Sequence, residues 1–245
     1  MDYKKAWPTR YARPWLLIND RPSYGVSGLV IVSLPPITKP AMRYNAEEID
    51  GRDGDIVTAL GYQAYDKEVG VGLRGDFDID KVIEFFATSG TVTFSSEPDK
   101  VYRFRQLESI DFERLVRYRT ATVKLHVQPF KTSRLAQPRS FDGSDAQAVV
   151  TNTGNVSAAP KYTVKGAGNV SLWLDGLQVL RITNDGEYTA VIDVANLEAA
   201  TPKGVLLNRK VTGDYQRLAL SPGRHTIKWS GDVKSLAIED YSRWV

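Results

Sequence analysis

The residues whose side chains could carry catalysis are few and far apart in this sequence. It contains no cysteine and only two histidines, His126 and His225. The lack of cysteine excludes thiolate nucleophiles, disulfides and thiolate metal sites. A histidine-based triad or a multi-histidine metal site would have to combine residues from both halves of the chain. Both histidines are therefore interpreted as surface or interstrand residues.

Three aspartates have the spacing that opens a calcium-binding loop. Asp76, Asp78 and Asp80 alternate along the chain, as the first ligands of such a loop do. Lys81 stands at the position that needs glycine, and Ala87 at the one that needs glutamate. Because the two most demanding positions fail, we expect these aspartates to cap a helix instead.

Two further patterns have both a ligand-binding and a structural interpretation. The segment Gly166-Ala167-Gly168 follows a predicted strand, but the residues after it open no helix. A bulge or hairpin loop is therefore expected there rather than a phosphate site. Trp173 and Trp229 could stack on sugar rings, yet large aromatic side chains usually contribute burial, so we expect both in a core. The sequence predicts no catalytic residue, no metal site and no cofactor.

Apolar residues in most segments alternate with a period of two, which is typical of half-buried strands. The clearest strand covers Thr120 to Gln128 and is expected to end at Pro129. Further strands of the first half are expected at 28–34, 55–60, 69–73, 91–95 and 101–107.

Helical spacing of apolar residues occurs from Ile79 to Phe86, with Asp78 or Asp80 placed to cap the start. This amphipathic helix should lie against a sheet. A second, shorter helical segment is expected at 111–118.

A polar stretch without periodicity, 131–139, is the best linker candidate in the chain. It predicts two domains, 1–134 and 135–245. The short turns of the second domain include Asp175-Gly176, which suits a type I′ hairpin, and Ser221-Pro222-Gly223-Arg224, which suits a type II turn. Eight strand-like segments suggest a sandwich: 146–152, 161–165, 170–174, 177–182, 188–194, 215–220, 225–230 and 235–239.

The composition is that of an ordinary folded protein. Of the 245 residues, 42% are hydrophobic and 25% charged, and 32 Lys and Arg residues are balanced by 29 Asp and Glu residues. No segment is strongly basic, which argues against nucleic acid as the main partner. No apolar stretch is long enough for a signal peptide or a membrane span, so neither is expected.

A series of motifs in the first half resembles the siphophage distal tail protein family. Pro35-Pro36 is followed by Ile49-Asp50-Gly51-Arg52-Asp53-Gly54-Asp55, which resembles a signature of that family. The family's short helix, its strand and acidic turn, and its Pro-Phe strand end follow in the same order, here at 76–86, 90–103 and Pro129-Phe130.

The second half is similar to the carboxy-terminal domain of the same family. The likeness lies in segments 152–162, 213–218 and 220–227 and in Ser242-Arg243-Trp244. His225 departs from the pattern, since asparagine is commoner after the Pro-Gly turn. The residues that carry the signature are Gly51, Arg52, Asp53, Gly54, Pro129, Phe130, Arg243 and Trp244.

The resemblance implies a mainly β protein with a short helix: a β-rich, ring-forming N-terminal domain followed by a galectin-like β-sandwich. It implies a structural virion protein of the phage tail tip, assembled in the bacterial host cytoplasm, with no enzymatic activity. The expected partners are five further copies in a hexamer, a tail tube protein above, a tail-associated fibre or hub protein below, and receptor-binding proteins as further candidates. No membrane and no sequence-specific nucleic acid are expected as partners.

Two structural expectations accompany this hypothesis. The turn Gly51-Arg52-Asp53-Gly54 should form a tight loop, with glycine where the backbone dihedrals are unusual and Arg52 available for a carboxylate. A long edge strand such as 120–128 should offer unpaired backbone groups for assembly.

Two other functions stay open. The chain could be a carbohydrate-binding module of the tail tip that contacts cell-wall polysaccharide, or a hydrolase that opens the cell wall. The His-x-Asn-x-Arg and Trp-Gly-x-Glu clusters by which galectins hold galactosides are absent, since Trp229 is followed by Ser230-Gly231. The hydrolase has no recognisable active site.

Overall fold

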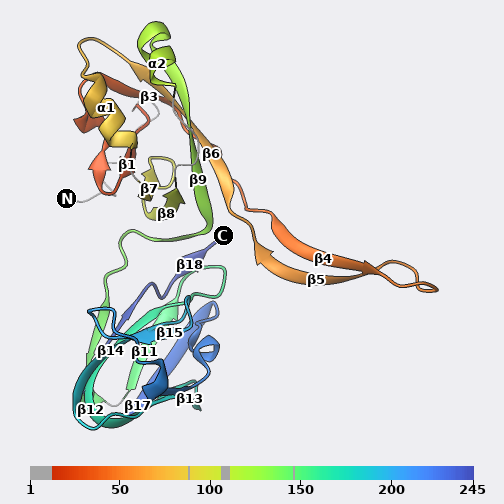
Figure 1. Cartoon of the computed structure of the whole chain (residues 1–245), viewed down its shortest axis with the longest axis vertical. Helices are drawn as coiled ribbons and strands as arrows, with labels where there is room; N and C mark the ends of the chain where they lie inside the picture. The colour runs from red at the N-terminus through yellow and green to blue at the C-terminus, as the bar shows by residue number, and fades with distance from the viewer. Residues whose placement is uncertain (1–12, 88, 106–110, 146) are drawn as a thin grey trace. The chain divides into compact units, whose positions relative to one another are not determined.

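The computed structural model describes residues 13–87, 89–105, 111–145 and 147–245. The chain divides into two compact units, one reaching to Arg134 and one from Leu135 to Trp244. Both are built mainly from antiparallel strands, with two α-helices in the described part of the first unit (Figure 1). No helix among the described residues is long and apolar enough to span a membrane.

The first unit is one antiparallel sheet with two helices and a separate hairpin. Hydrogen bonds connect seven of its strands in the order β2-β1-β7-β8-β9-β6-β3. Apolar side chains from these strands and both helices form one core. The bounds are β1 (Leu16–Ile18), β2 (Arg21–Pro22), β3 (Leu29–Ser33), β4 (Met42–Glu48), β5 (Asp55–Tyr62), β6 (Tyr65–Leu73), α1 (Ile79–Phe86), β7 (Gly90–Phe94), β8 (Lys100–Arg105), α2 (Phe112–Tyr118) and β9 (Thr120–Ser133).

Both predicted helices are confirmed, together with the acidic cap of the first. The Asp78 carboxylate accepts hydrogen bonds from the backbone N–H groups of Asp80 and Lys81 at 3.1 and 3.3 Å. Asp111 caps α2 by accepting from the backbone N–H of Arg114 at 2.8 Å. Such caps satisfy N–H groups that have no partner within the helix.

The prediction that the long strand ends at Pro129 is wrong, because β9 continues to Ser133. Its pairing with β6 ends at Val127, and its pairing with β8 shifts register between Tyr102 and Phe104. Pro129 lies within that irregularity, where no ladder hydrogen bond requires a backbone N–H. The predicted linker 131–139 therefore overlaps the end of a strand.

The expectation that 120–128 is an edge strand is met only in part. Strand β9 lies between β8 and β6 in the sheet, but its two neighbours cover different stretches. Strand β6 pairs with residues 120–127, whereas the described part of β8 pairs with residues 126–127 and 131–133. The edges of this sheet are β2 and β3. Alternation in the sequence identifies the buried face of a strand, but both central and edge strands show it.

Strands β4 and β5 form a two-stranded sheet of their own, seen as an extended ribbon in Figure 1. Every residue of β4 is exposed, and so is every residue of β5 except Tyr62, which is half-buried. The pattern of apolar residues predicts β5 in part and does not predict β4, because an exposed strand lacks the buried stripe that produces such a pattern.

The second unit is a sheet of short and long antiparallel strands around its own core. The main path is β10-β17-β12-β13-β16, with β11 on β17, β14 on β12 and β15 on β14. The bounds are β10 (Arg139–Asp142), β11 (Gln147–Asn152), β12 (Lys161–Leu174), β13 (Leu177–Ile182), β14 (Glu187–Asp193), β15 (Glu198–Ala200), β16 (Val211–Gly213), β17 (Gly223–Glu239) and β18 (Arg243–Trp244).

Two pairs of predicted strands are each one long strand with a bulge. Strand β12 joins 161–165 to 170–174, and β17 joins 225–230 to 235–239. The pairing of β12 with β17 shifts register between Lys165 and Gly166 and again between Ala167 and Ser171. These shifts confirm the predicted bulge at the glycine-rich segment. Bulges bend the strands they interrupt, so these strands help the sheet to curl around its core.

The predicted strand 215–220 is wrong. Residues Tyr215–Leu218 form a 3₁₀ helix, and the Asp214 carboxylate accepts from the backbone N–H of Gln216 at 2.9 Å. An aspartate that binds a backbone N–H two residues ahead favours a turn over a strand. The type I′ turn is supported, since Asp175 and Gly176 have φ of 50° and 88°.

The bulge in β12 generates a first prediction. A Cβ added at Gly166 would lie 2.5 Å from the backbone oxygen of Asp232, whereas one at Gly186 would meet no atom within 4 Å. We expect Gly166→Ala to destabilise the protein by about 1–3 kcal/mol and Gly186→Ala to have little effect, as measured by urea unfolding. Equal unfolding midpoints for the two variants would contradict the close packing of β12 on β17.

Candidate functional site

The signature residues Gly51 to Gly54 form the tip of the β4–β5 hairpin. Gly51 and Gly54 have φ of 81° and 75°, in the left-handed region that favours glycine. The backbone N–H of Arg52 donates to the carbonyl of Ile49 at 3.1 Å. The Arg52 side chain has no ion pair within the described residues and is exposed, so it is available to a partner carboxylate.

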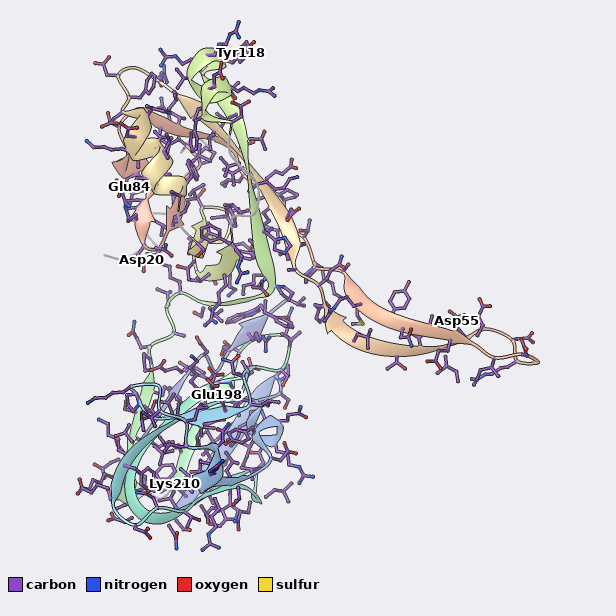
Figure 2. The ribbon with its side chains drawn as sticks, viewed as in Figure 1. Asp20, Asp55, Glu84, Tyr118, Glu198 and Lys210 are labelled. Atoms are coloured by element: carbon purple, nitrogen blue, oxygen red, sulfur yellow. The ribbon has the colours of Figure 1, made fainter. Side chains whose placement is uncertain are left out.

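One face of the hairpin is mainly apolar, and the opposite face carries polar side chains together with Ile56. The register pairs Tyr44 with Ala59 and Ala46 with Val57, which places these four residues on the same side. Tyr44 is 63% exposed and Val57 60% exposed. The opposite side pairs Asn45 with Thr58 and Glu47 with Ile56. Figure 2 shows the side chains standing free on both sides of the ribbon, with Asp55 labelled on β5.

Three contacts hold the root of this hairpin. The Tyr62 ring at the end of β5 packs edge-on against the Phe130 ring, with centroids 5.6 Å apart. The Lys67 ammonium donates to the backbone carbonyl of Pro36 at 2.9 Å, just before β4. The Tyr65 hydroxyl donates to the carbonyl of Thr38 at 3.5 Å. The signature residue Phe130 therefore supports the element that carries Gly51 to Gly54.

A buried charge cluster lies behind the root, and the sequence analysis missed it. The Lys131 ammonium is 2.7 Å from the Glu97 carboxylate, whose other oxygen accepts from the Tyr102 hydroxyl. Lys67 is 3% exposed, and its ammonium lies 5.3 Å from the centre of the Tyr65 ring and 5.1 Å from that of Tyr102. These rings and the carboxylate replace water around two cations.

The titration of this cluster reflects its burial. Burial lowers the pKa of Lys67, the Glu97 carboxylate acts in the opposite direction, and the charge of Lys131 lowers it further. Burial and the neighbouring carboxylate raise the pKa of Tyr65 to about 12. The pKa of Tyr102 is raised well above its usual range by burial first and then by its hydrogen bond to Glu97. The phenols therefore stay neutral, and their role is to pack and donate.

The second unit contains a serine, histidine and aspartate in contact, but their geometry does not suit a nucleophile. His225 Nδ1 lies 2.7 Å from the Asp175 carboxylate, and Nε2 lies 2.8 Å from the backbone carbonyl of Ser221. A backbone carbonyl only accepts, so a hydrogen bond to it requires a proton on Nε2. In that arrangement Nε2 has no lone pair with which to take a proton from the Ser221 hydroxyl, 3.3 Å away.

This arrangement is a structural clasp between two turns. Asp175 also accepts from the backbone N–H of Thr226 at 2.8 Å. His225 is 8% exposed, which fits the interstrand interpretation. His126 is likewise interstrand, because its Nδ1 lies 2.7 Å from the carboxylate of Asp66, its register partner on β6.

The two tryptophans of the second unit differ in position. Trp229 is 5% exposed, belongs to the core, and donates its indole N–H to the carbonyl of Gly143 at 2.9 Å. The expectation of burial is confirmed for Trp229. It is wrong for Trp173, which is half-buried and lies outside the core, because its neighbours Leu172 and Leu174 take the inward positions of β12.

The remaining predicted residues lie at the end of the second unit. Arg243 and Trp244 form β18, and the backbone carbonyl of Arg243 accepts from the N–H of Val156 at 3.4 Å. Gly154 packs so closely that an added Cβ would lie 1.8 Å from that carbonyl oxygen. Within the ranges that the structure covers, no three His, Asp or Glu side chains gather as a metal site.

Comparison with known proteins gives a likeness in structure alone. No protein-family model matches the sequence, and no curated protein matches it. The structure is similar to the crystal structure of the SPP1 Dit (gp 19.1) protein, described as a paradigm of hub adsorption apparatus in Gram-positive infecting phages. The TM-score is 0.66 at 16% sequence identity, over 96% of this chain and 100% of that chain. This chain has the Dit fold.

The predicted fold class is thereby confirmed, and so is the resemblance to distal tail proteins at the level of the fold. The likeness extends over almost the full length of both chains, so it includes the described strands of both units. Within the Dit fold, the structure brings Phe130 to the root of the hairpin that carries the four tip residues.

The buried charge cluster generates the second prediction. We expect Glu97→Gln to destabilise the first unit by about 3 kcal/mol, because it leaves the Lys131 charge buried without its counterion. Denaturant unfolding would measure this loss. The matched control is Glu113→Gln, which removes an exposed carboxylate from the first turn of α2. A Glu97→Gln variant as stable as the control would contradict the role assigned to the carboxylate.

The clasp generates the third prediction. Desolvation raises the pKa of Asp175, but the hydrogen bonds from Thr226 and His225 lower it by more, so the net shift is downward. A lowered folded pKa stabilises the protein above the unfolded pKa of about 4, and this contribution is lost as the pH falls through the folded value.

We therefore expect Asp175→Asn to be less stable than the unmodified protein by about 1 kcal/mol at pH 5, and the difference to shrink at pH 3. Urea unfolding at both pH values measures it. Asp185→Asn, at an exposed position, serves as the control. A difference for Asp175→Asn that is the same at both pH values would contradict a contribution from the ionised carboxylate.

Proposed function

We propose that this chain is a distal tail protein, a non-enzymatic structural component of the hub at the tail tip of a long-tailed phage. The Dit fold over nearly the whole chain supports this function. The motifs in segments 35–55 and 90–103 and at Pro129-Phe130 support it independently, since they were recognised from the sequence alone. The geometry of Ser221, His225 and Asp175 gives no support to a hydrolase.

The observation that carries the assembly proposal is the apolar face of the β4–β5 hairpin. Met42, Tyr44 and Val57 expose it to solvent, and its own chain leaves it uncovered. A two-stranded hairpin is marginally stable in water on its own. An exposed apolar face of this kind marks an interaction site. We assign it to contact with a second copy of the chain.

A contact between the hairpin of one copy and a different surface of the next is heterologous. Heterologous contacts form a closed ring when the rotation between neighbours closes. The resemblance to the distal tail protein family supports six copies in the proposed ring. The free edges of the sheet, β2 and β3, offer unpaired backbone groups to a neighbouring subunit.

The two domains take different roles in this proposal. Residues 1–134 form the ring, which continues the tail tube above and joins a tail-associated fibre or hub protein below. Residues 135–245 form a galectin-like β-sandwich. The protein would reside at the virion tail tip after assembly in the bacterial host cytoplasm, with receptor-binding proteins as further candidate partners.

The fourth prediction tests the ring. Light scattering of the purified protein over a range of concentrations should give a mass of six copies, because contact between copies buries the apolar faces of the hairpins. Val57→Glu places a charge on the apolar face and should lower that mass, since burying an unpaired charge is costly.

The matched control is Thr58→Glu, the next residue along β5, whose side chain lies on the opposite face, beside Asn45. It should leave the mass unchanged. A protein that is monomeric at every concentration, or a hexamer that Val57→Glu leaves intact, would overturn the assignment of the hairpin to a contact between copies.

A further inference from the structure

The outer face of the second unit carries a row of side chains that the proposed tail-hub function does not use. The strand registers pair Gln147 with Lys228, Lys228 with Trp173, and Trp173 with Gln178. These residues belong to the four adjacent strands β11, β17, β12 and β13. An indole ring therefore lies among two amides and an ammonium on one side of the sheet.

The alternation of the strands makes this the outward side. Leu172 and Leu174, on either side of Trp173, are buried in the core, and so are Ile227 and Trp229 on either side of Lys228. Since successive side chains of a strand point to opposite faces, Trp173 and Lys228 point away from the core. Trp173 is only partly buried and contributes to the lining of a hollow on this face.

A hollow of about 480 Å³ opens beside this ring, and its lining includes Asp145, Gln147, Lys228 and Ser230 as well as Trp173. This volume lies within the range of small-molecule sites. Among the residues that the structure describes, none of those four polar side chains makes a hydrogen bond or an ion pair. Their donors and acceptors are therefore free to bind a ligand.

The rim of the hollow is held in place by the core and the clasp. Gly176, which contributes to the lining, follows Asp175 in the turn that Thr226 and His225 fix. On the other side, the buried indole of Trp229 holds the carbonyl of Gly143, at the start of the short 3₁₀ helix that ends at Asp145. A site with a fixed frame loses less conformational entropy when it binds a ligand.

The combination of groups selects one class of ligand. The exposed face of an aromatic ring attracts the slightly positive C–H bonds on one side of a pyranose. The amides, the hydroxyl, the ammonium and the carboxylate around it can bind sugar hydroxyls as donors and acceptors. Lys228 and Asp145 have opposite charges, so the site has no net charge that would favour an ionic ligand. We propose that this face binds a neutral pyranose saccharide.

Binding at this face is independent of the proposed assembly function, since its residues all belong to the second unit. The test titrates the purified full chain with chitotriose, cellotriose and maltotriose by calorimetry, up to about 10 mM. In parallel, NMR follows the indole N–H signals of the five tryptophans. At least one of the three sugars should bind and shift one indole signal far more than the others. If none of the three sugars binds, the proposal is overturned.

Substitutions then locate the site. Trp173→Ala should weaken binding about tenfold or more, and Trp173→Phe, which keeps an aromatic face, should retain most of it. Leu177→Ala is the matched control, because Leu177 is an exposed apolar residue beside the same turn but outside the lining of the hollow. Binding that survives Trp173→Ala unchanged, or that falls equally in Leu177→Ala, would overturn the assignment to this face.

Discussion

The position of the β4–β5 hairpin in the first unit depends on the contacts of the buried Lys67 ammonium. Removing a charge from water costs several kcal/mol, so it must find other partners. It finds the carbonyl of Pro36, the rings of Tyr65 and Tyr102, and the nearby carboxylate of Glu97. Because Pro36 precedes β4 and Lys67 lies in the strand after β5, the same interaction fixes where the hairpin leaves the sheet.

The hairpin has an apolar face that the rest of the described chain leaves uncovered. Its root is packed through Tyr62 and Phe130, whereas Tyr44 and Val57 further along expose apolar surface on its mainly apolar face. A packed root and an uncovered apolar face suit the β4–β5 hairpin to the proposed contact with a neighbouring subunit. The tip glycines allow the tight loop that closes such an arm, which gives a physical reason for the signature at 51–54.

In the second unit, the alternation of side chains along the strands builds both the core and the row of residues on the outer face. In β12 and β17 the inward residues build the core, and the outward residues place Trp173 and Lys228 side by side. The bulges at Gly166 and Gly231 bend both strands, so one hydrogen-bonded sheet can curl around that core. The clasp of His225 and Asp175 then joins the turn before β13 to β17. The contacts of His225 and Asp175 thus tie two turns of this fold together.

The sequence by itself determined the β-rich class, both helices with their aspartate caps, the hairpin turn at Asp175-Gly176 and the likeness to distal tail proteins, because each rests on neighbours in the chain. The prediction that Trp173 lies in a core was wrong, although the alternation of Leu172 and Leu174 around it pointed to an outward position. Only the tertiary structure decided that β9 runs through Pro129, that β4 pairs with β5, and that Lys67, Glu97 and Lys131 share one buried site. Those features depend on which strand lies opposite, and Glu97 meets Lys131, 34 positions further along the chain, only when the sheet has formed.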